Sequence, residues 1–276
     1  MTPVQVLRRA AEHLSRRGIE RPLPTAEILL MTVLGTDRAG LYTRREELDA
    51  REARMFARAL CQRCAGTPLQ HLTGEQAFRG ITLEVRPGVF IPRPETEVLV
   101  SIALAEVAGV DAPVVVDVGC GTGAIALSIK AERPDATVFA TDLSPEAVEL
   151  ARANGGRLGL DVTVLLGDLL QPVPAELRGW VDLVVSNPPY VTPEEYDDLP
   201  DEVRAEPSLA LVGGPEVYRE LAAGALRCLR DGGVLAVEIG AAHAVRIAGL
   251  LSESFTDVRV ERDLAGRDRV VVGRRP

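Results

Sequence analysis

Short apolar runs alternate with helical patterns through residues 113–276, and this alternation restricts the fold more than any other feature of the chain. The expected strands are 114–118, 137–141, 162–166, 181–186 and 233–239, and the expected helices are 124–133, 145–158, 215–230 and 242–252. Strands that alternate with helices form a parallel sheet covered by helices. The last two runs, 258–261 and 269–272, are expected to finish it as an antiparallel pair. The pattern therefore predicts an α/β, Rossmann-like fold with a seven-stranded mixed sheet.

The N-terminal part has a different pattern. Residues 4–65 show helical spacing, with a second helix expected to be capped by Thr25 and a longer one over 46–65. Residues 74–85 alternate as a short hairpin around Arg79-Gly80. We therefore expect three parts, which are a small all-helical recognition domain at 1–73, a β-hairpin linker at 74–92 and the α/β domain at 93–276.

Composition indicates an ordinary globular protein. The apolar fraction is 46% and the charged fraction 26%, and no apolar run approaches the roughly 20 residues that a membrane span needs. Without an apolar signal core at the N-terminus, a cytoplasmic location is expected. Cys61 and Cys64 form a CxxC pair, but no second pair or histidine cluster accompanies them, so no metal site is expected.

Charge is unevenly distributed along the chain. Residues 1–80 hold 13 Arg and 9 acidic residues, whereas 81–276 hold 18 Lys and Arg and 31 acidic residues. The second part is thus strongly negative. An acidic α/β domain argues against binding along a nucleic acid backbone, which requires basic surface.

The turn after residues 114–118 combines an acidic residue with three glycines. It reads Asp117-Val118-Gly119-Cys120-Gly121-Thr122-Gly123. Such glycines let a ligand approach the backbone closely, and similar turns bind phosphates. The spacing is not that of the dinucleotide fingerprint, however, and a carboxylate at Asp117 would repel pyrophosphate. A ligand with an amino group and a sulfonium suits the turn better, so S-adenosylmethionine is expected there, bound by Asp117, Gly119, Cys120, Gly121, Thr122 and Gly123.

Acidic residues also end the next two strands. Asp142 follows the second strand about 20 residues after the glycines, where an acidic residue can bind ribose hydroxyls. Asp168 follows the third strand and can accept the exocyclic amine of adenine, and Leu169 can pack on the ring. Each aspartate alone is weak evidence because Asp is common in turns. Three at successive strand ends indicate a cofactor site.

A rigid turn, Asn187-Pro188-Pro189-Tyr190, ends the fourth strand. Two prolines cannot continue a strand, because each lacks an N–H and has φ near −65°. The turn thus presents the Asn187 carboxamide, a backbone carbonyl and an aromatic ring where open α/β sheets bind ligands. Asn187 Oδ1 and the Pro188 carbonyl can accept both hydrogens of a planar –NH2 group. The sequence pattern identifies no histidine or glutamate as a general base.

Five segments together carry a resemblance to one known family. They are Pro68-Leu69-Gln70-His71-Leu72-Thr73-Gly74, Phe90-Ile91-Pro92-Arg93-Pro94-Glu95-Thr96-Glu97, the glycine turn with Ala124-Ile125-Ala126-Leu127, Ser186–Tyr190, and Asp263-Leu264-Ala265-Gly266-Arg267-Asp268-Arg269. Over essentially the whole chain they are similar to the protein-(glutamine-N5) methyltransferases of peptide chain release factors (HemK/PrmC type).

The resemblance implies a class I methyltransferase domain at 93–276 and an activity. A methyl group would pass from S-adenosylmethionine, leaving S-adenosylhomocysteine, to N5 of the glutamine in the Gly-Gly-Gln motif of bacterial class 1 release factors. The implied catalytic residues are Asn187, Pro188 and Tyr190, with Pro189 and Phe90 completing the substrate site, and Arg93, Thr96 and Asn187 also contacting the cofactor. The chain departs from the family pattern after Gly214, where a longer loop is expected.

Other functions remain open at the level of sequence. The same turn occurs in methyltransferases of adenine N6 and of rRNA guanine N2. These two activities are disfavoured by the acidic α/β domain and by the lack of a basic target-recognition domain. A glutamine methyltransferase acting on another protein, or a non-catalytic module that docks on translation factors, are further alternatives. A monomer is expected, because no long apolar surface stripe is evident.

Overall fold

The computed structural model describes the backbone of residues 1–276 and every side chain apart from that of Asp201. The chain divides into two compact units. The first comprises residues 1–75 together with 200–205, and the second comprises residues 76–199 together with 206–276. Each unit is described by itself below.

The first unit is helical. Its N-terminal helices are α1 (Pro3–Arg16), α2 (Pro22–Leu34), α3 (Arg38–Thr43), α4 (Ala50–Cys64) and α5 (Leu69–Thr73). The amphipathic helices bury a shared apolar core that includes Leu7, Leu14, Leu30 and Phe56. Short helix α10 (Asp201–Arg204) groups with this unit, and the Glu202 carboxylate lies 2.7 Å from the Arg63 guanidinium.

Two helix starts differ from the sequence expectation. Helix α2 begins at Pro22, since proline is preorganised for the first turn, and Thr25 therefore lies inside the helix and does not cap it. Helix α4 begins at Ala50 and not at 46. Asp49 caps it by accepting hydrogen bonds from the N–H groups of Arg51 and Glu52, and the Glu52 carboxylate accepts one from the Asp49 N–H.

The second unit contains a seven-stranded sheet with the order β5-β4-β3-β6-β7-β9-β8. The strands are β3 (Val114–Val118), β4 (Thr137–Asp142), β5 (Thr163–Leu166), β6 (Val181–Ser186), β7 (Leu229–Glu238), β8 (Thr256–Arg262) and β9 (Asp268–Arg274). Strands β3 to β7 pair in parallel, and β9 pairs antiparallel with both β7 and β8. The predicted mixed sheet with an antiparallel end is confirmed.

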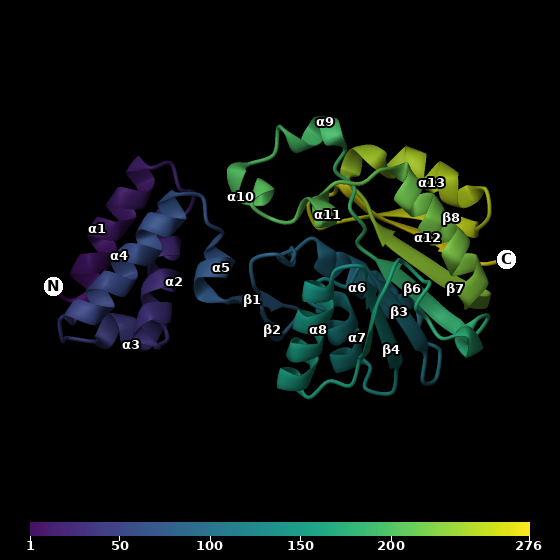
Figure 1. The fold of residues 1–276 in the computed structure, drawn as a ribbon, viewed down its shortest axis with the longest axis horizontal. Helices are drawn as coiled ribbons and strands as arrows, with labels where there is room; N and C mark the ends of the chain where they lie inside the picture. The colour runs from purple at the N-terminus through teal and green to yellow at the C-terminus, as the bar shows by residue number, and fades with distance from the viewer. The chain divides into compact units, whose positions relative to one another are not determined.

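Helices cover both faces of this sheet (Figure 1). One face packs on α6 (Thr96–Glu106), α7 (Ala124–Glu132) and α8 (Pro145–Leu158), and the other on α12 (Pro215–Cys228) and α13 (Ala244–Ser252). Every residue of β6 is buried, as expected for a central strand covered on both sides. Short 3-10 helices occur at η1 (Ala175–Leu177) and η2 (Ala241–His243).

The segment before the sheet forms the expected hairpin. Strands β1 (Glu75–Phe78) and β2 (Ile81–Glu84) make a separate two-stranded sheet. Phe78 and Leu83 join the core under α6, α7 and α8. Helix α6 then begins at Thr96, so Pro92 and Pro94 belong to the segment that leads into the helix and not to its first turn.

The segment after β6 contains structure that the sequence did not predict. It forms the short helices α9 (Pro193–Tyr196) and α11 (Ser208–Leu211), besides α10. Val191 and Val212 make an isolated parallel bridge, supported by hydrogen bonds from the Val191 N–H to the Leu211 carbonyl and from the Gly213 N–H to the Val191 carbonyl. The chain directly after the Asn-Pro-Pro-Tyr turn is therefore fixed to the chain directly before α12.

Among the described residues, no helix combines the length and the apolar character that crossing a bilayer requires. In the same part of the chain, no three or more His, Cys, Asp and Glu side chains are grouped so as to hold a metal ion.

Candidate active site

The register of the sheet brings the candidate residues to one edge. Val118 of β3 pairs with both Thr141 of β4 and Ser186 of β6, and Ser186 pairs with Val237 of β7. Four adjacent strands therefore end side by side, with the glycine turn, Asp142, Asn187 and Glu238 at or directly after their carboxyl ends. The strand order reverses between β3 and β6, which is where open α/β sheets bind ligands.

The glycine turn is shaped by its backbone conformation. Gly119, Gly121 and Gly123 all have positive φ, of 72°, 53° and 83°. The N–H groups of Gly119 and Cys120 both donate to the Thr141 carbonyl, at 2.8 and 3.0 Å. A Cβ added at Gly119 or Gly121 would meet no atom within 4 Å. The outer surface of the turn is therefore open, with room for a ligand to lie on the backbone.

Asp117 is fully buried beneath this turn. Its Oδ2 accepts a hydrogen bond of 3.0 Å from the N–H of Ala126 in α7, whereas Oδ1 has no partner among the described residues. Burial raises the pKa of Asp117 to about 7, against the effect of the Ala126 hydrogen bond, and the nearby charge of Asp142 raises it further. A buried carboxylate oxygen without a donor suits a cationic or amino-bearing ligand.

Asp142 supports the glycine turn directly. Its Oδ2 accepts a hydrogen bond of 2.8 Å from the Gly121 N–H, and Oδ1 accepts one of 2.9 Å from the Ser144 N–H. Burial raises its pKa, while these backbone hydrogen bonds act to lower it. Each carboxylate oxygen has a second lone pair, so these bonds leave Asp142 able to accept from a ligand as well.

The turn after β5 is held in an unusual conformation. Leu169 has a φ of 45°, in the left-handed region that a branched side chain rarely adopts. The Thr141 hydroxyl donates a hydrogen bond of 2.7 Å to the Leu169 carbonyl and so ties this turn to the end of β4. Asp168 is half-buried and accepts a hydrogen bond of 3.0 Å from Gln171 Nε2.

Asn187 is hydrogen-bonded to the start of α6. Its Nδ2 donates to the Oγ1 of Thr96 at 3.2 Å. Thr96, at the start of α6, is 4% exposed, and Glu238, at the end of β7, is 1% exposed and has no hydrogen-bond partner for Oε2 among the described residues. Burial raises the pKa of Glu238 to about 7, although the Thr96 hydroxyl and the positive charge of Arg269 act to lower it.

The diproline turn is closely packed from behind. A Cβ added at Gly213 would lie 2.1 Å from the Pro189 carbonyl oxygen, so only glycine fits there.

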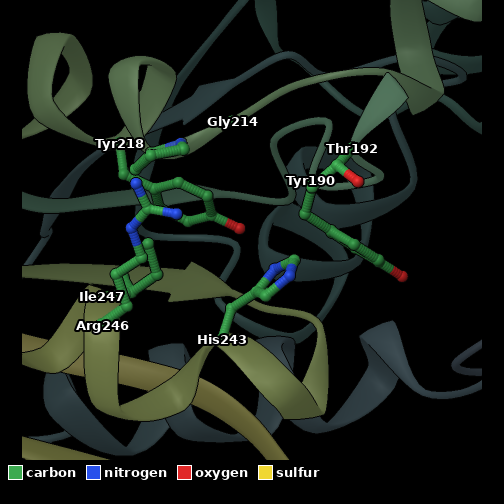
Figure 2. A pocket seen from close by; sticks show the side chains of 8 residues that line it. Tyr190, Thr192, Gly214, Tyr218, His243, Arg246 and Ile247 are labelled. Atoms are coloured by element: carbon green, nitrogen blue, oxygen red, sulfur yellow. The ribbon is translucent and has the colours of Figure 1, made fainter. Parts of the chain in front are cut away.

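Tyr190 is half-buried, and burial raises its pKa, with a further rise from the charge of Glu238. A cavity of about 20 Å³, the size of roughly one water molecule, lies beside Tyr190 (Figure 2). It is lined by Tyr190, Thr192, Gly214, Pro215, Tyr218, His243, Arg246 and Ile247.

The segment that contains Phe90 is fixed by one buried carboxylate. Glu206, 4% exposed, accepts a hydrogen bond of 2.9 Å from the Ile91 N–H through Oε2 and forms an ion pair with Arg93 through Oε1. The Arg93 guanidinium lies over the Phe90 ring, 4.9 Å from its centroid. The Arg93 and Glu206 charges thus position Phe90, and the Arg93 charge also acts on Tyr190.

Sequence reasoning missed two acidic residues at this site. Glu238 ends a buried strand immediately before Ile239 and Gly240, which is the same signal that identified Asp117 and Asp142. Glu206 carries no comparable signal, because it lies in an irregular segment and its partners are far away in the sequence.

Solved structures share this fold. The catalytic domain of hMettl16, solved with the MAT2A 3′UTR hairpin 6, matches with a TM-score of 0.58 and 12% identity, over 78% of this chain and 81% of that one. The 16S rRNA N2 G1207 methyltransferase RsmC of T. thermophilus, solved with AdoMet and guanosine, matches with a TM-score of 0.55 and 21% identity, over 73% of this chain and 50% of that one. At such identities these neighbours show the fold alone. Together with the seven-stranded sheet, they show the Rossmann-like fold of class I methyltransferases.

Sequence comparisons identify the family within that class. Residues 5–74 match the model of the PrmC N-terminal domain, and residues 81–203 match that of the methyltransferase small domain. Proteins named release factor glutamine methyltransferase from Moorella thermoacetica and Deinococcus radiodurans are each 43% identical to this chain, over 98% of its length and 97% of theirs. The chain belongs to the release factor glutamine methyltransferase family.

Proposed function

We propose that the protein transfers a methyl group from S-adenosylmethionine to the side-chain N5 of the glutamine in the Gly-Gly-Gln motif of bacterial class 1 release factors. The names of the full-length relatives support this substrate. The observation that carries the chemistry is the hydrogen bond from Asn187 Nδ2 to Thr96. Because the nitrogen of this amide is held by the protein, its oxygen is left to accept a hydrogen bond from a substrate.

The residues present fit the cofactor. The amino group of S-adenosylmethionine would supply the donor that the buried Oδ1 of Asp117 lacks. The open backbone at Gly119 and Gly121 offers the surface for its amino-acid part, and Cys120, Thr122 and Gly123 complete the turn that would bind it. Asp142 would accept from the ribose hydroxyls, while Asp168 and Leu169 would bind adenine. When bound, the cofactor supplies an electrophilic methyl group on a sulfonium.

The turn at the end of β6 would orient the substrate. An amide nitrogen is a poor nucleophile because its lone pair is delocalised into the carbonyl. If Asn187 Oδ1 and the Pro188 carbonyl accept both N–H bonds of the glutamine, they hold its nitrogen in one position and increase its electron density. Pro189, Tyr190 and Phe90 would enclose the amide, with Arg93 holding Phe90. Orientation of this kind contributes up to roughly 7–11 kcal/mol in well-aligned reactions.

Mass spectrometry of a release factor incubated with the protein and S-adenosylmethionine tests this function. The expected product carries one added methyl group, on the Gly-Gly-Gln glutamine alone. Asn187→Ala should lower kcat by at least about 100-fold, by analogy with the loss of one oriented polar group at an active site, while cofactor binding stays measurable. Full activity of this variant would discard the mechanism.

Parallel incubations address the remaining alternatives. Methylation of RNA or DNA and not of the release factor would favour an exocyclic-amine methyltransferase, and a glutamine modified in another protein would favour a different protein substrate. A release factor substrate would place the enzyme in the cytoplasm. We expect a monomer, which sedimentation of the purified chain measures.

A further inference from the structure

We propose that Asn154 is a positioning residue, which holds the glycine turn and the end of the hairpin at Glu84 in one fixed relation. This inference rests on the proposed function, because it assigns a task toward the turn that would bind S-adenosylmethionine. Asn154 lies in α8 and is fully buried. It acts through the backbone groups of residues that are far from it in the sequence.

The Asn154 amide uses all of its hydrogen-bonding positions. Its Nδ2 donates to the Thr122 carbonyl at 3.0 Å and to the Glu84 carbonyl at 3.1 Å. Its Oδ1 accepts from the Glu84 N–H at 2.8 Å and from the Arg157 guanidinium at 3.4 Å. Because carbonyls can only accept and an N–H can only donate, these partners allow the amide a single orientation.

Two of these hydrogen bonds hold the hairpin on α8. The amide takes up both the N–H and the carbonyl of Glu84, the last residue of β2, as a neighbouring strand would. Further along the chain, Val89 packs on Ala147 and Leu150 of the same helix. Phe90, which would enclose the substrate, follows directly. The bonds to Glu84 therefore fix the start of the segment that carries Phe90.

The remaining donor of the amide holds the glycine turn from its inner side. Thr122 is 2% exposed, so its carbonyl lies where an unpaired acceptor costs free energy. At Gly123 the turn lies close to α8, since an added Cβ would be 3.3 Å from the Cβ of Ala151. The backbone at Gly119 and Gly121 is open on the other side. Asn154 thus fixes the inner side of the turn and leaves the open side for the cofactor.

The shared amide makes the hairpin and the glycine turn depend on each other. A side chain bound to three backbone groups cannot move toward one of them without weakening its bonds to the others. A change at the end of the hairpin should therefore alter the affinity for the cofactor. Loss of the amide should alter the binding of cofactor and substrate together.

Asn154→Ala on the full chain tests the amide directly. Isothermal titration calorimetry should show the Kd for S-adenosylhomocysteine raised at least about tenfold, as expected when buried carbonyls lose their donor. The KM for the release factor should rise at least about threefold, because the segment before Phe90 is released. Asp182→Asn is the control. It alters a buried side chain at the opposite end of β6, which accepts from the Val114 N–H at 2.8 Å, and it should lower the melting temperature and leave Kd and KM unchanged.

Glu84→Pro tests the same contact from the hairpin. It removes the N–H that Asn154 Oδ1 accepts, and a proline is tolerated there because this N–H bonds to a side chain and not to the strand ladder. The Kd for S-adenosylhomocysteine should rise at least about threefold. Glu84→Ala keeps the N–H and should bind like the unaltered protein. Because the two altered residues lie on different elements, failure of one variant to fold leaves the other decisive.

The two substitutions combined separate this role from a general loosening of the fold. Adding Glu84→Pro to Asn154→Ala should cause no further loss of affinity, because the contact is already absent. Losses of affinity that multiply, or a Kd unchanged in either single variant, would overturn the proposal. An equal rise of Kd in Asp182→Asn would do the same.

These titrations need no release factor, so they separate this proposal from the proposed substrate. Variants that change Kd as expected, in a protein that leaves release factor unmethylated, would support the role of Asn154 and overturn the substrate. Methylation of release factor with the Kd of both single variants unchanged would have the opposite meaning.

Discussion

Binding of the cofactor to this protein should release a proton near neutral pH, and Asp117 is the source. In the free enzyme, burial raises the pKa of this carboxyl from its ordinary value near 3.8 to about 7. The rise corresponds to a free-energy cost of about 4 kcal/mol for ionising this carboxyl in the protein, relative to ionising it in water. An amino group beside Oδ1 stabilises the carboxylate and lowers the pKa again. At pH 6.5 a group with a pKa of about 7 is roughly three-quarters protonated, so most of one proton should leave.

Isothermal titration calorimetry with S-adenosylmethionine at pH 6.5, in buffers of different ionisation enthalpy, measures this proton. The cofactor amino group is itself charged at that pH, because α-amino groups titrate near 8. Asp117→Asn should abolish the release and weaken binding by at least about tenfold, the loss of one charge-assisted hydrogen bond. Glu238→Gln should keep the release, which separates the two buried acids. An unchanged proton count in Asp117→Asn would refute the reasoning.

The same pKa has a consequence for stability. A carboxyl whose pKa is raised on folding contributes stability that is present below its unfolded value, near 3.8, and that is lost as the pH rises through its folded value, about 7. The melting temperature of the free enzyme should therefore fall as the pH rises over this range, and bound cofactor should make that fall smaller.

Two further substitutions test how the site is held in place. Gly213→Ala should lower kcat by about tenfold or more with little change in cofactor affinity, because the added Cβ would lie 2.1 Å from the Pro189 carbonyl oxygen and displace the turn. Gly214→Ala is the control, because its Cβ meets only the flexible end of the Glu216 side chain. Equal kinetics of the two variants would contradict this packing. Glu206→Ala should lower the free energy of unfolding by about 3 kcal/mol in chemical denaturation, since it leaves Arg93 and the Ile91 N–H unpaired. It should also raise KM for the release factor, because Phe90 is no longer held in position. A decrease in the free energy of unfolding below about 1 kcal/mol would show that water replaces the carboxylate.

Local patterns in the sequence predicted most of the fold because they depend on near neighbours. Alternation of apolar runs with helical spacing identified the strands of the parallel sheet, and the final antiparallel pair followed from its two short runs. Helix boundaries were less certain, since competing signals lie close together. Pro22 begins α2 ahead of Thr25, and Asp49 begins α4 later than residue 46. The short helices between β6 and α12 were missed because contacts such as the Val191–Val212 bridge define that segment.

The chemical groups at the strand ends were likewise visible in the sequence, because glycine, aspartate and diproline restrict the backbone wherever they occur. Their relations to one another were not. The open face of the glycine turn, the unpaired oxygen of Asp117 and the hydrogen bond from Asn187 to Thr96 each depend on residues from different elements. Burial and hydrogen-bond direction arise only when those elements pack together. The sequence by itself thus determined which groups are present at the carboxyl edge of the sheet, and the tertiary structure decided which of their atoms are already bound by the protein and which remain for a ligand.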